Sequence, residues 1–255
     1  MRICVLSERM APPFDEGIKN YALHLAQGLR AEHDVLALTA LGRSAPELGV
    51  RNVPANRLLL SFPLARALRR FGADLIIYIP TACATLFSSL RTRFLKIHAQ
   101  GAPVVEVALQ VRRYGALSRL LMPLLRPDLV LVQSERTRGL LEGLGYRTAF
   151  STPGVDVERF KPVNGATRDA LRRRYGIPSD SYVVLHVGHL RRERNVQVLR
   201  ALQRSDENQV IVVGSSSTPQ ERALVKELIR AGVRVIDDYV SHIAQVYQMA
   251  DCYVF

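Results

Sequence analysis

Residues 2–39, RICVLSERMAPPFDEGIKNYALHLAQGLRAEHDVLALT, decide the fold class of this chain. The short apolar runs at 2–6 and 35–39 are typical of buried parallel strands. Between them, Asp15 is expected to cap a helix. Its apolar face recurs at helical spacing in Ile18, Tyr21, Ala22, Leu25, Ala26 and Leu29. Strand, helix and strand in this order form one βαβ unit.

The same alternation continues to the last residue. Strands are predicted at 75–79, 104–107, 129–132 and 148–151, with a helix at 135–144. It then restarts, with strands at 182–187, 210–213, 233–236 and 252–255 and helices at 195–203, 219–231 and 243–250. Pro219 suits the first turn of its helix. Repeated units of this kind imply parallel sheets with helices on both faces.

We therefore predict an α/β protein with two Rossmann-like, doubly wound domains. The first covers residues 1–160 and the second residues 161–255. The linker is expected around residues 153–178, where prolines, glycines and charges cluster. The second domain is expected to be incomplete, because residues 252–255 form an apolar strand that normally lies inside a sheet.

The composition favours an anionic partner. The 255 residues carry a formal net charge of +12, which suits a phosphorylated small molecule, an acidic membrane or nucleic acid, although a solvated basic surface is the alternative. No secretory signal and no apolar run of membrane-spanning length is present. Cys4, Cys83 and Cys252 have no metal-like spacing and are expected to be free buried thiols in a reducing cytoplasm.

Two stretches, residues 58–71 and 112–126, place arginines beside leucine and phenylalanine. Such helices can lie on an anionic membrane surface, which would make the protein peripheral at the inner membrane face. Packing of the apolar face on the sheet is the commoner outcome, and one helix can do both. No nucleic-acid partner is expected, because the aromatic residues fall in strands and helices instead of between the arginines.

Candidate ligand-binding residues follow the predicted strands, because open α/β sheets bind ligands beyond the carboxyl ends of their strands. The loop after the strand at 182–187 crowds arginines into the start of a predicted helix, a setting that suits a diphosphate. Its candidates are Gly188, His189, Arg191, Arg192 and Arg194. A solvated basic loop is the alternative.

Two further loops have weaker candidates. Gly17 opens the first helix and lets the backbone approach an anion. Gly214 and Ser215, with Ser216 and Ser217, follow the strand at 210–213 and either line a ligand or make a flexible turn. No metal site is expected, because no acidic pair follows a strand.

Five stretches resemble the retaining GT-B glycosyltransferases of family four. They are residues 12–26, residues 132–141, residues 152–162 (TPGVDVERFKP), residues 185–190 (LHVGHL) and residues 239–255. The third is similar to the family pattern P-N-G-V-D-x-x-x-F-x-P, and the fourth to V-G-R-L. The resemblance spans nearly the whole chain and keeps the order of the family.

The resemblance implies transfer of a sugar, with retention, from a nucleotide-diphosphate sugar to a saccharide or lipid-linked acceptor. His189 and Arg194 take the positions of the family's diphosphate-binding arginine and lysine, and Arg191 or Arg192 compensates if His189 is neutral. Arg194 would stabilise the leaving diphosphate. Gly17 matches the opening-loop glycine near the phosphates. Beyond the nucleotide sugar, no cofactor is implied.

The resemblance also includes a segment that contacts the nucleobase, and the chain departs from the family pattern elsewhere. Tyr239 and Val240 match the segment whose backbone meets the nucleobase. Leu109 and Gln110 occupy the region where the family commonly has a histidine. The family's paired glutamates would lie beyond Phe255, so little activity is expected from this chain alone. The alternative is a non-catalytic module that binds a nucleotide or an anionic surface.

Overall fold

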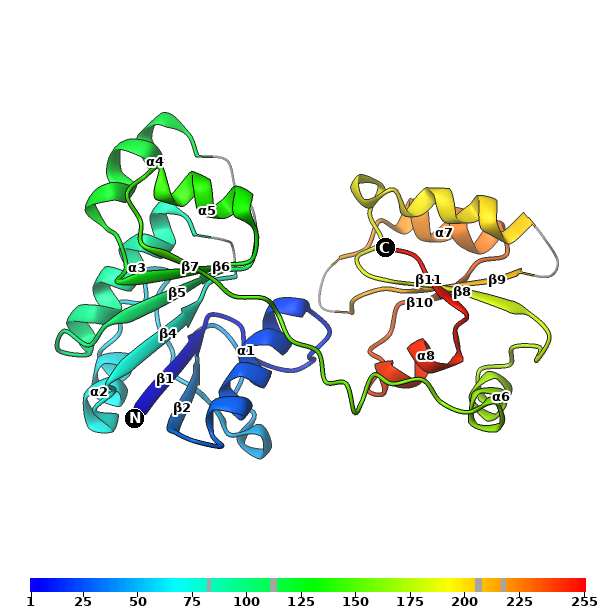
Figure 1. Ribbon diagram of the computed structural model, residues 1–255, viewed down its shortest axis with the longest axis horizontal. Coiled ribbons are helices and arrows are strands. Elements are labelled where there is room, and N and C mark those ends of the chain that lie inside the picture. Colours follow the sequence, from blue (N-terminus) through cyan, green and yellow to red (C-terminus); the bar gives the residue numbers. More distant parts are fainter. Residues whose placement is uncertain (82–83, 111–113, 205–207, 217–218) are drawn as a thin grey trace. The chain divides into compact units, whose positions relative to one another are not determined.

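The chain folds into two compact units. The computed structural model describes residues 1–81, 84–110, 114–204, 208–216 and 219–255. Unit 1 is Met1–Pro153 and unit 2 is Gly154–Phe255 (Figure 1). The predicted boundary lies seven residues later, after residue 160, within the expected linker.

Unit 1 contains a seven-stranded parallel sheet with strand order β3-β2-β1-β4-β5-β6-β7. The strands are β1 (Arg2–Ser7), β2 (Asp34–Thr39), β3 (Val50–Asn52), β4 (Leu75–Ile79), β5 (Val104–Ala108), β6 (Leu129–Val132) and β7 (Thr148–Phe150). β1 lies between β2 and β4, with Ile3 in register with Val35 and Leu75. The strand order reverses beside β1, which is the switch point where doubly wound sheets bind ligands.

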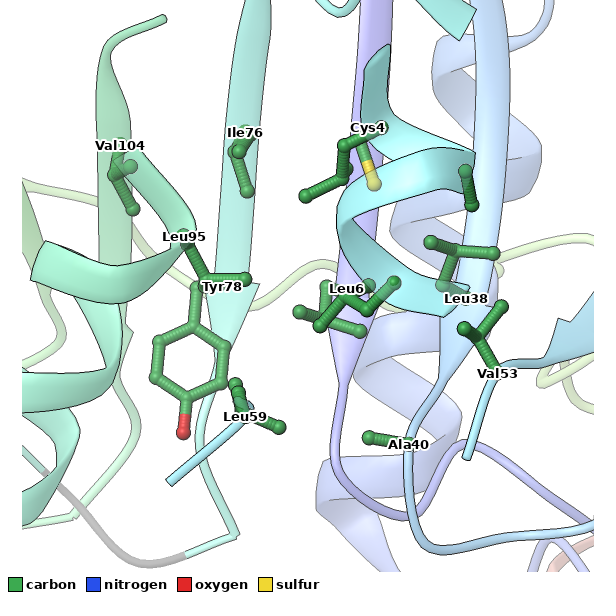
Figure 2. Close-up of a cluster of buried hydrophobic side chains, with 13 residues drawn as sticks. Cys4, Leu6, Leu38, Ala40, Val53, Leu59, Ile76, Tyr78, Leu95 and Val104 are labelled. Carbon is green, nitrogen blue, oxygen red and sulfur yellow. The ribbon is translucent and has the colours of Figure 1, made fainter. Parts of the chain in front are cut away.

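Helices cover both faces of this sheet (Figure 1). They are α1 (Gly17–Leu29), α2 (Phe62–Phe71), α3 (Leu86–His98), α4 (Ala116–Leu121) and α5 (Glu135–Glu142), with short 3₁₀ turns η1 (Pro46–Leu48) and η2 (Met122–Leu124). The predicted apolar face of α1 is confirmed, since it packs on Ile3, Val5 and Ile77. On the other face, Leu6, Ile76 and Tyr78 pack against α2 and α3 (Figure 2).

Side-chain caps start several of these helices. The Ser61 hydroxyl accepts from the backbone N–H of Leu64, and Thr85 and Ser88 form a capping box at α3. The prediction that Asp15 caps α1 is wrong. Glu16 is the N-cap residue and makes no side-chain cap bond, while the Asp15 carboxylate lies 3.7 Å from the Lys19 ammonium.

Unit 2 contains a four-stranded parallel sheet with strand order β10-β9-β8-β11. The strands are β8 (Tyr182–Val187), β9 (Asn208–Val213), β10 (Arg234–Ile236) and β11 (Cys252–Tyr253). Its helices are α6 (Gly165–Arg174), α7 (Arg222–Arg230) and α8 (Ile243–Met249), with 3₁₀ helices η3 (Arg192–Arg194) and η4 (Val196–Arg204). η4 and α7 pack on one face of the sheet, and α6 and α8 on the other (Figure 1).

Four predictions for unit 2 need correction. The segment after Asn195 is a 3₁₀ helix, preceded by Asn195 in the left-handed region (φ 56°). Helix α7 begins at Arg222, so Pro219 lies before its first turn. The expected linker contains α6. Cys252 is half-buried, whereas Cys4 is buried, and this burial raises the pKa of the Cys4 thiol to about 12. Cys83 is outside the described residues.

The two basic–apolar stretches have different outcomes. The first forms α2, which buries Leu64 and Leu68 against the sheet, as the packing alternative predicts. In the second, α4 buries none of its residues, and Leu120 and Leu124 are 71% and 77% exposed. Arg112 and Arg113 fall outside the described residues. Among the helices that the structure describes, none is long and apolar enough to cross a membrane.

Candidate functional site

The carboxyl ends of β8, β9 and β10 meet at one edge of the unit 2 sheet. The strands pair in parallel, with Val187 opposite Val213 and Val213 opposite Ile236. Two hydrogen bonds continue this pairing into the loops, from Gly188 N–H to the Val213 carbonyl (2.9 Å) and from Gly214 N–H to the Ile236 carbonyl (2.7 Å). The loops that carry Arg194, Ser215 and Tyr239 therefore leave the sheet side by side.

Gly188 and Arg194 approach each other closely within the first of these loops. A Cβ atom built on Gly188 would lie 3.7 Å from Nη1 of Arg194 and 3.2 Å from Nε2 of His186. The absence of a side chain at residue 188 leaves a small volume beside the Arg194 guanidinium and the His186 ring. A phosphate group suits this position, because it accepts charge-assisted hydrogen bonds from a guanidinium group.

His186 is a polar residue of this edge that the sequence analysis did not select. It lies on β8, is 6% exposed, and its Nδ1 is 2.9 Å from the Val254 carbonyl. A carbonyl oxygen only accepts hydrogen bonds, so Nδ1 carries a hydrogen and donates it to Val254. Within the described part of the chain, Nε2 has no hydrogen-bond partner. A histidine inside an otherwise apolar strand was the available signal.

Gln220 braces two of the loops and was also missed. Its Oε1 accepts from the Leu190 N–H (2.6 Å), and its Nε2 donates to the Ser215 carbonyl (2.6 Å). Ser215 is 5% exposed, and this contact is partly buried. The loop after β8 is thereby tied to the loop after β9, which holds the predicted site residues of both loops in one place.

The three arginines of the first loop have different surroundings. Arg192 forms an ion pair with Glu227 on α7, and its N–H donates to the Glu221 carboxylate (3.1 Å). Arg191 and Arg194 are exposed and form no ion pair with any residue that the structure describes. The positive charge available to a ligand here therefore comes from Arg191 and Arg194, whereas Arg192 is partly neutralised.

The remaining predicted residues divide between the two units. Tyr239 is 47% exposed after β10, while Val240 packs against the core formed by α6 and α8. His189 lies half-buried between Gly188 and Arg191. Gly17 lies in unit 1 as the first residue of α1, with nothing within 4 Å of a Cβ built on it. Ser217 is outside the described residues.

The carboxyl edge of the unit 1 sheet holds a buried carboxylate that was also missed. Glu8 follows β1 and is 4% exposed. It accepts hydrogen bonds from the Tyr78 hydroxyl (2.5 Å), the Thr81 hydroxyl (2.7 Å) and the Arg91 guanidinium (2.5 Å). Glu8 thus joins β1, β4 and α3, and its charge is already satisfied by protein groups.

Glu106 on β5 lies near this cluster and is fully buried. Its two carboxylate oxygens have no hydrogen-bond partner among the described residues. Burial raises the pKa of Glu106 to about 7, against the opposing effects of the Ser88 hydroxyl and the Arg91 guanidinium. The side chain is therefore largely protonated under mildly acidic conditions. In the described residues of both units, no group of three His, Cys, Asp or Glu side chains is placed to hold a metal ion.

Comparisons with known sequences match only parts of the chain. The chain is similar to the D-inositol 3-phosphate glycosyltransferase of Thermomonospora curvata, with 43% identity over 68 residues, which cover 24% of this chain and 16% of that protein. It is similar to the enzyme of the same name from Corynebacterium jeikeium, with 34% identity over 101 residues, covering 35% and 24%. The chain thus aligns with less than a quarter of these relatives. No family model matches it.

Comparisons with solved structures match nearly the whole chain. The Anabaena protein HepE in complex with UDP and glucose superposes with a TM-score of 0.72 at 16% identity, covering 99% of this chain and 73% of that one. A glycosyltransferase from Rickettsia africae gives 0.69 at 14% identity, covering 99% and 72%. The predicted α/β fold of the GT-B type is confirmed by this match.

Proposed function

We propose that this chain binds a nucleotide-diphosphate sugar and takes part in transferring the sugar, with retention, to a saccharide or lipid-linked acceptor. The proposal draws on the names of the two glycosyltransferase relatives and on the HepE complexes with UDP and with UDP-glucose. The observation that carries it is the approach of Arg194 to Gly188 at the carboxyl end of β8.

The physical reason lies in the charge of the leaving group. When the bond between the sugar and the diphosphate breaks, negative charge develops on the phosphate oxygens. Guanidinium groups held beside those oxygens stabilise that charge more in the transition state than in the ground state. We assign this role to Arg194, with Arg191 and His189 beside it. Gly214 and Ser215 would line the nucleotide, and Tyr239 and Val240 would contact its base.

The same proposal covers the other partners. The nucleotide sugar is the co-substrate, and no separate cofactor or metal is required, so EDTA should not change donor binding. Gly17 stays a predicted phosphate-binding residue, and the acceptor would bind mainly to unit 1. A cytoplasmic location, peripheral at an anionic membrane face, is part of the proposal and is tested by co-sedimentation with liposomes.

The test is a titration of the chain with UDP, UDP-glucose and GDP-sugars by calorimetry, followed by an assay for sugar transfer. Arg194→Ala should weaken binding of the nucleotide diphosphate about tenfold or more, because one charge-assisted hydrogen bond is lost. Arg230→Ala is the matched control. Arg230 is exposed on α7, outside the loops of the site, and its loss should leave affinity unchanged.

The results of the titration either support or contradict the proposal. Equal affinity of wild type and Arg194→Ala would remove Arg194 from the site. Failure of the wild type to bind any nucleotide diphosphate would overturn the proposal.

A further inference from the structure

Unit 1 has a cavity of about 410 Å³ beside the edge of its sheet. It lies along α2, next to β3, which is the edge strand, and β2. The lining includes Arg51 from β3, Leu36 from β2, and Phe62, Arg66, Arg70 and Phe71 from α2. None of these residues belongs to the carboxyl-edge loops assigned above to the nucleotide sugar.

The three arginines of this cavity are unpaired. Arg51, Arg66 and Arg70 are exposed, and no carboxylate among the residues placed by the structure forms an ion pair with them. Other surface arginines of unit 1 have such partners, for example Arg2 with Asp74. Arg66 and Arg70 are four residues apart on one helix, where like charges repel. Three unpaired cations in one concavity create a site that attracts an anion.

The arginine side of α2 does not contribute to the core. Leu64 and Leu68 on the opposite side are fully buried in it. Phe62, the first residue of α2, lies on the same side of the helix as Arg66 and Arg70 and is 78% exposed. The cation of Arg51 is enough to prevent the edge strand β3 from pairing with a strand of another molecule. The additional arginines and the exposed ring on α2 therefore have a separate explanation.

The lining also defines the chemistry of the ligand. Guanidinium groups bind both carboxylates and phosphates through paired hydrogen bonds, but the three oxygens and the greater charge of a phosphoryl group let it contact several arginines at once. The volume is in the range of small-molecule pockets and far exceeds one phosphate ion. The rings of Phe62 and Phe71 provide apolar walls for the remainder. The ligand is thus an organic phosphate with an apolar portion.

We propose that this cavity, lined by Arg51, Arg66 and Arg70 with Phe62 and Phe71, is a second anion site that binds a phosphate ester carrying an apolar group. Such an ester has two sources, a soluble phosphorylated metabolite or the headgroup of an anionic lipid. Both present the same phosphate to the same arginines, and only the lipid brings a membrane surface to α2.

The experiment uses hexyl phosphate as the soluble probe and phosphatidylcholine vesicles with or without phosphatidylglycerol as the lipid probe. Binding of hexyl phosphate is followed by the NMR signals of the arginine Nε–H groups, which report where it binds. The double substitution Arg66→Gln with Arg70→Gln should weaken the binding about tenfold or more. Phe62→Ala should weaken binding of hexyl phosphate and leave binding of inorganic phosphate unchanged.

The matched control is Arg93→Gln with Arg136→Gln, which removes the same charge from exposed positions on α3 and α5. Thermal unfolding establishes that both double variants are folded. Selective loss of hexyl phosphate binding in the cavity variant supports a soluble ligand, and selective loss of binding to phosphatidylglycerol vesicles supports a lipid headgroup. Equal losses in both double variants, or no binding of either probe by the wild type, overturn the proposal.

Discussion

The carboxyl edges of the two sheets differ in whether their charged side chains have partners within the protein. In unit 1, the Glu8 carboxylate is buried and accepts hydrogen bonds from Tyr78, Thr81 and Arg91. In unit 2, Arg194 is exposed beside Gly188, and the buried Nε2 of His186 has no hydrogen-bond partner among the residues described. A charge already satisfied by protein groups stabilises the fold, whereas polar groups without partners are available to a ligand.

The largest expected effect tests the unit 1 side of this comparison. Glu8→Ala leaves the Arg91 guanidinium, whose side chain is only 15% exposed, without its carboxylate, and the buried Tyr78 hydroxyl without its acceptor. Unpairing a buried charge of this kind costs about 3–5 kcal/mol, so the urea midpoint of unit 1 should fall accordingly. Glu47→Ala, at an exposed position in η1, is the control and should be nearly neutral. A small effect of Glu8→Ala would show that the cluster does not stabilise the fold.

The next effect concerns Glu106 and depends on pH. Its pKa is raised from 4.5 to about 7, so the folded state holds a proton that the unfolded state loses between these values. Stability therefore falls as the pH rises from 4.5 to about 7 and is constant above. Glu106→Gln removes this dependence, and its free energy of unfolding relative to wild type should rise by about 3 kcal/mol across this window.

Unfolding in urea at a series of pH values measures this difference. Glu47→Gln is the control, and its pH profile should parallel that of the wild type. Parallel profiles of Glu106→Gln and wild type would mean that Glu106 ionises normally in the folded state. The carboxylate of Glu8 has hydrogen-bond partners, and that of Glu106 has none among the described residues. These two groups would then differ only in their hydrogen bonds.

The smallest expected effect is that of a substitution at Gly188 in unit 2. In Gly188→Ala, the new methyl group would lie 3.2 Å from His186 Nε2 and 3.7 Å from Arg194 Nη1, in the space assigned to a phosphate. We expect about 1 kcal/mol of destabilisation and about tenfold weaker binding of UDP. Gly165→Ala, where a Cβ atom meets nothing within 4 Å, should change neither. Unchanged UDP affinity in Gly188→Ala would place the phosphates elsewhere.

The predicted strands are mostly accurate because their signal is local. Residues 75–79, 129–132 and 182–187 match β4, β6 and β8 to the residue. A strand in a parallel sheet covered on both faces must be apolar along its length, which makes it visible in the sequence. β3 was missed because Val50 is its only apolar residue, so no apolar run marks it. The 3₁₀ form of η4 was missed because apolar periodicity does not distinguish it from an α-helix.

The candidate site was predictable only in part. Loops after parallel strands are expected to carry ligand-binding residues, and this expectation selected Gly188, Arg191 and Arg194. It did not indicate that Arg192 pairs with Glu227, 35 residues away, or that Gln220 joins two loops. Neither partner has a local pattern, because such a contact depends on how distant helices pack.

The order of apolar runs and turn residues was enough to determine the α/β class and the sheet edge where ligand-binding loops lie. Hydrophobic burial repeats along the chain at short range, so it can be read one segment at a time. Only the tertiary structure decided which charges are neutralised and which remain available. Glu8 meets Tyr78 across 70 residues, and the arginines of the α2 cavity have no ion-pair partner because no carboxylate in the described part of the chain folds beside them. The free energy of a charge depends on its neighbours in space.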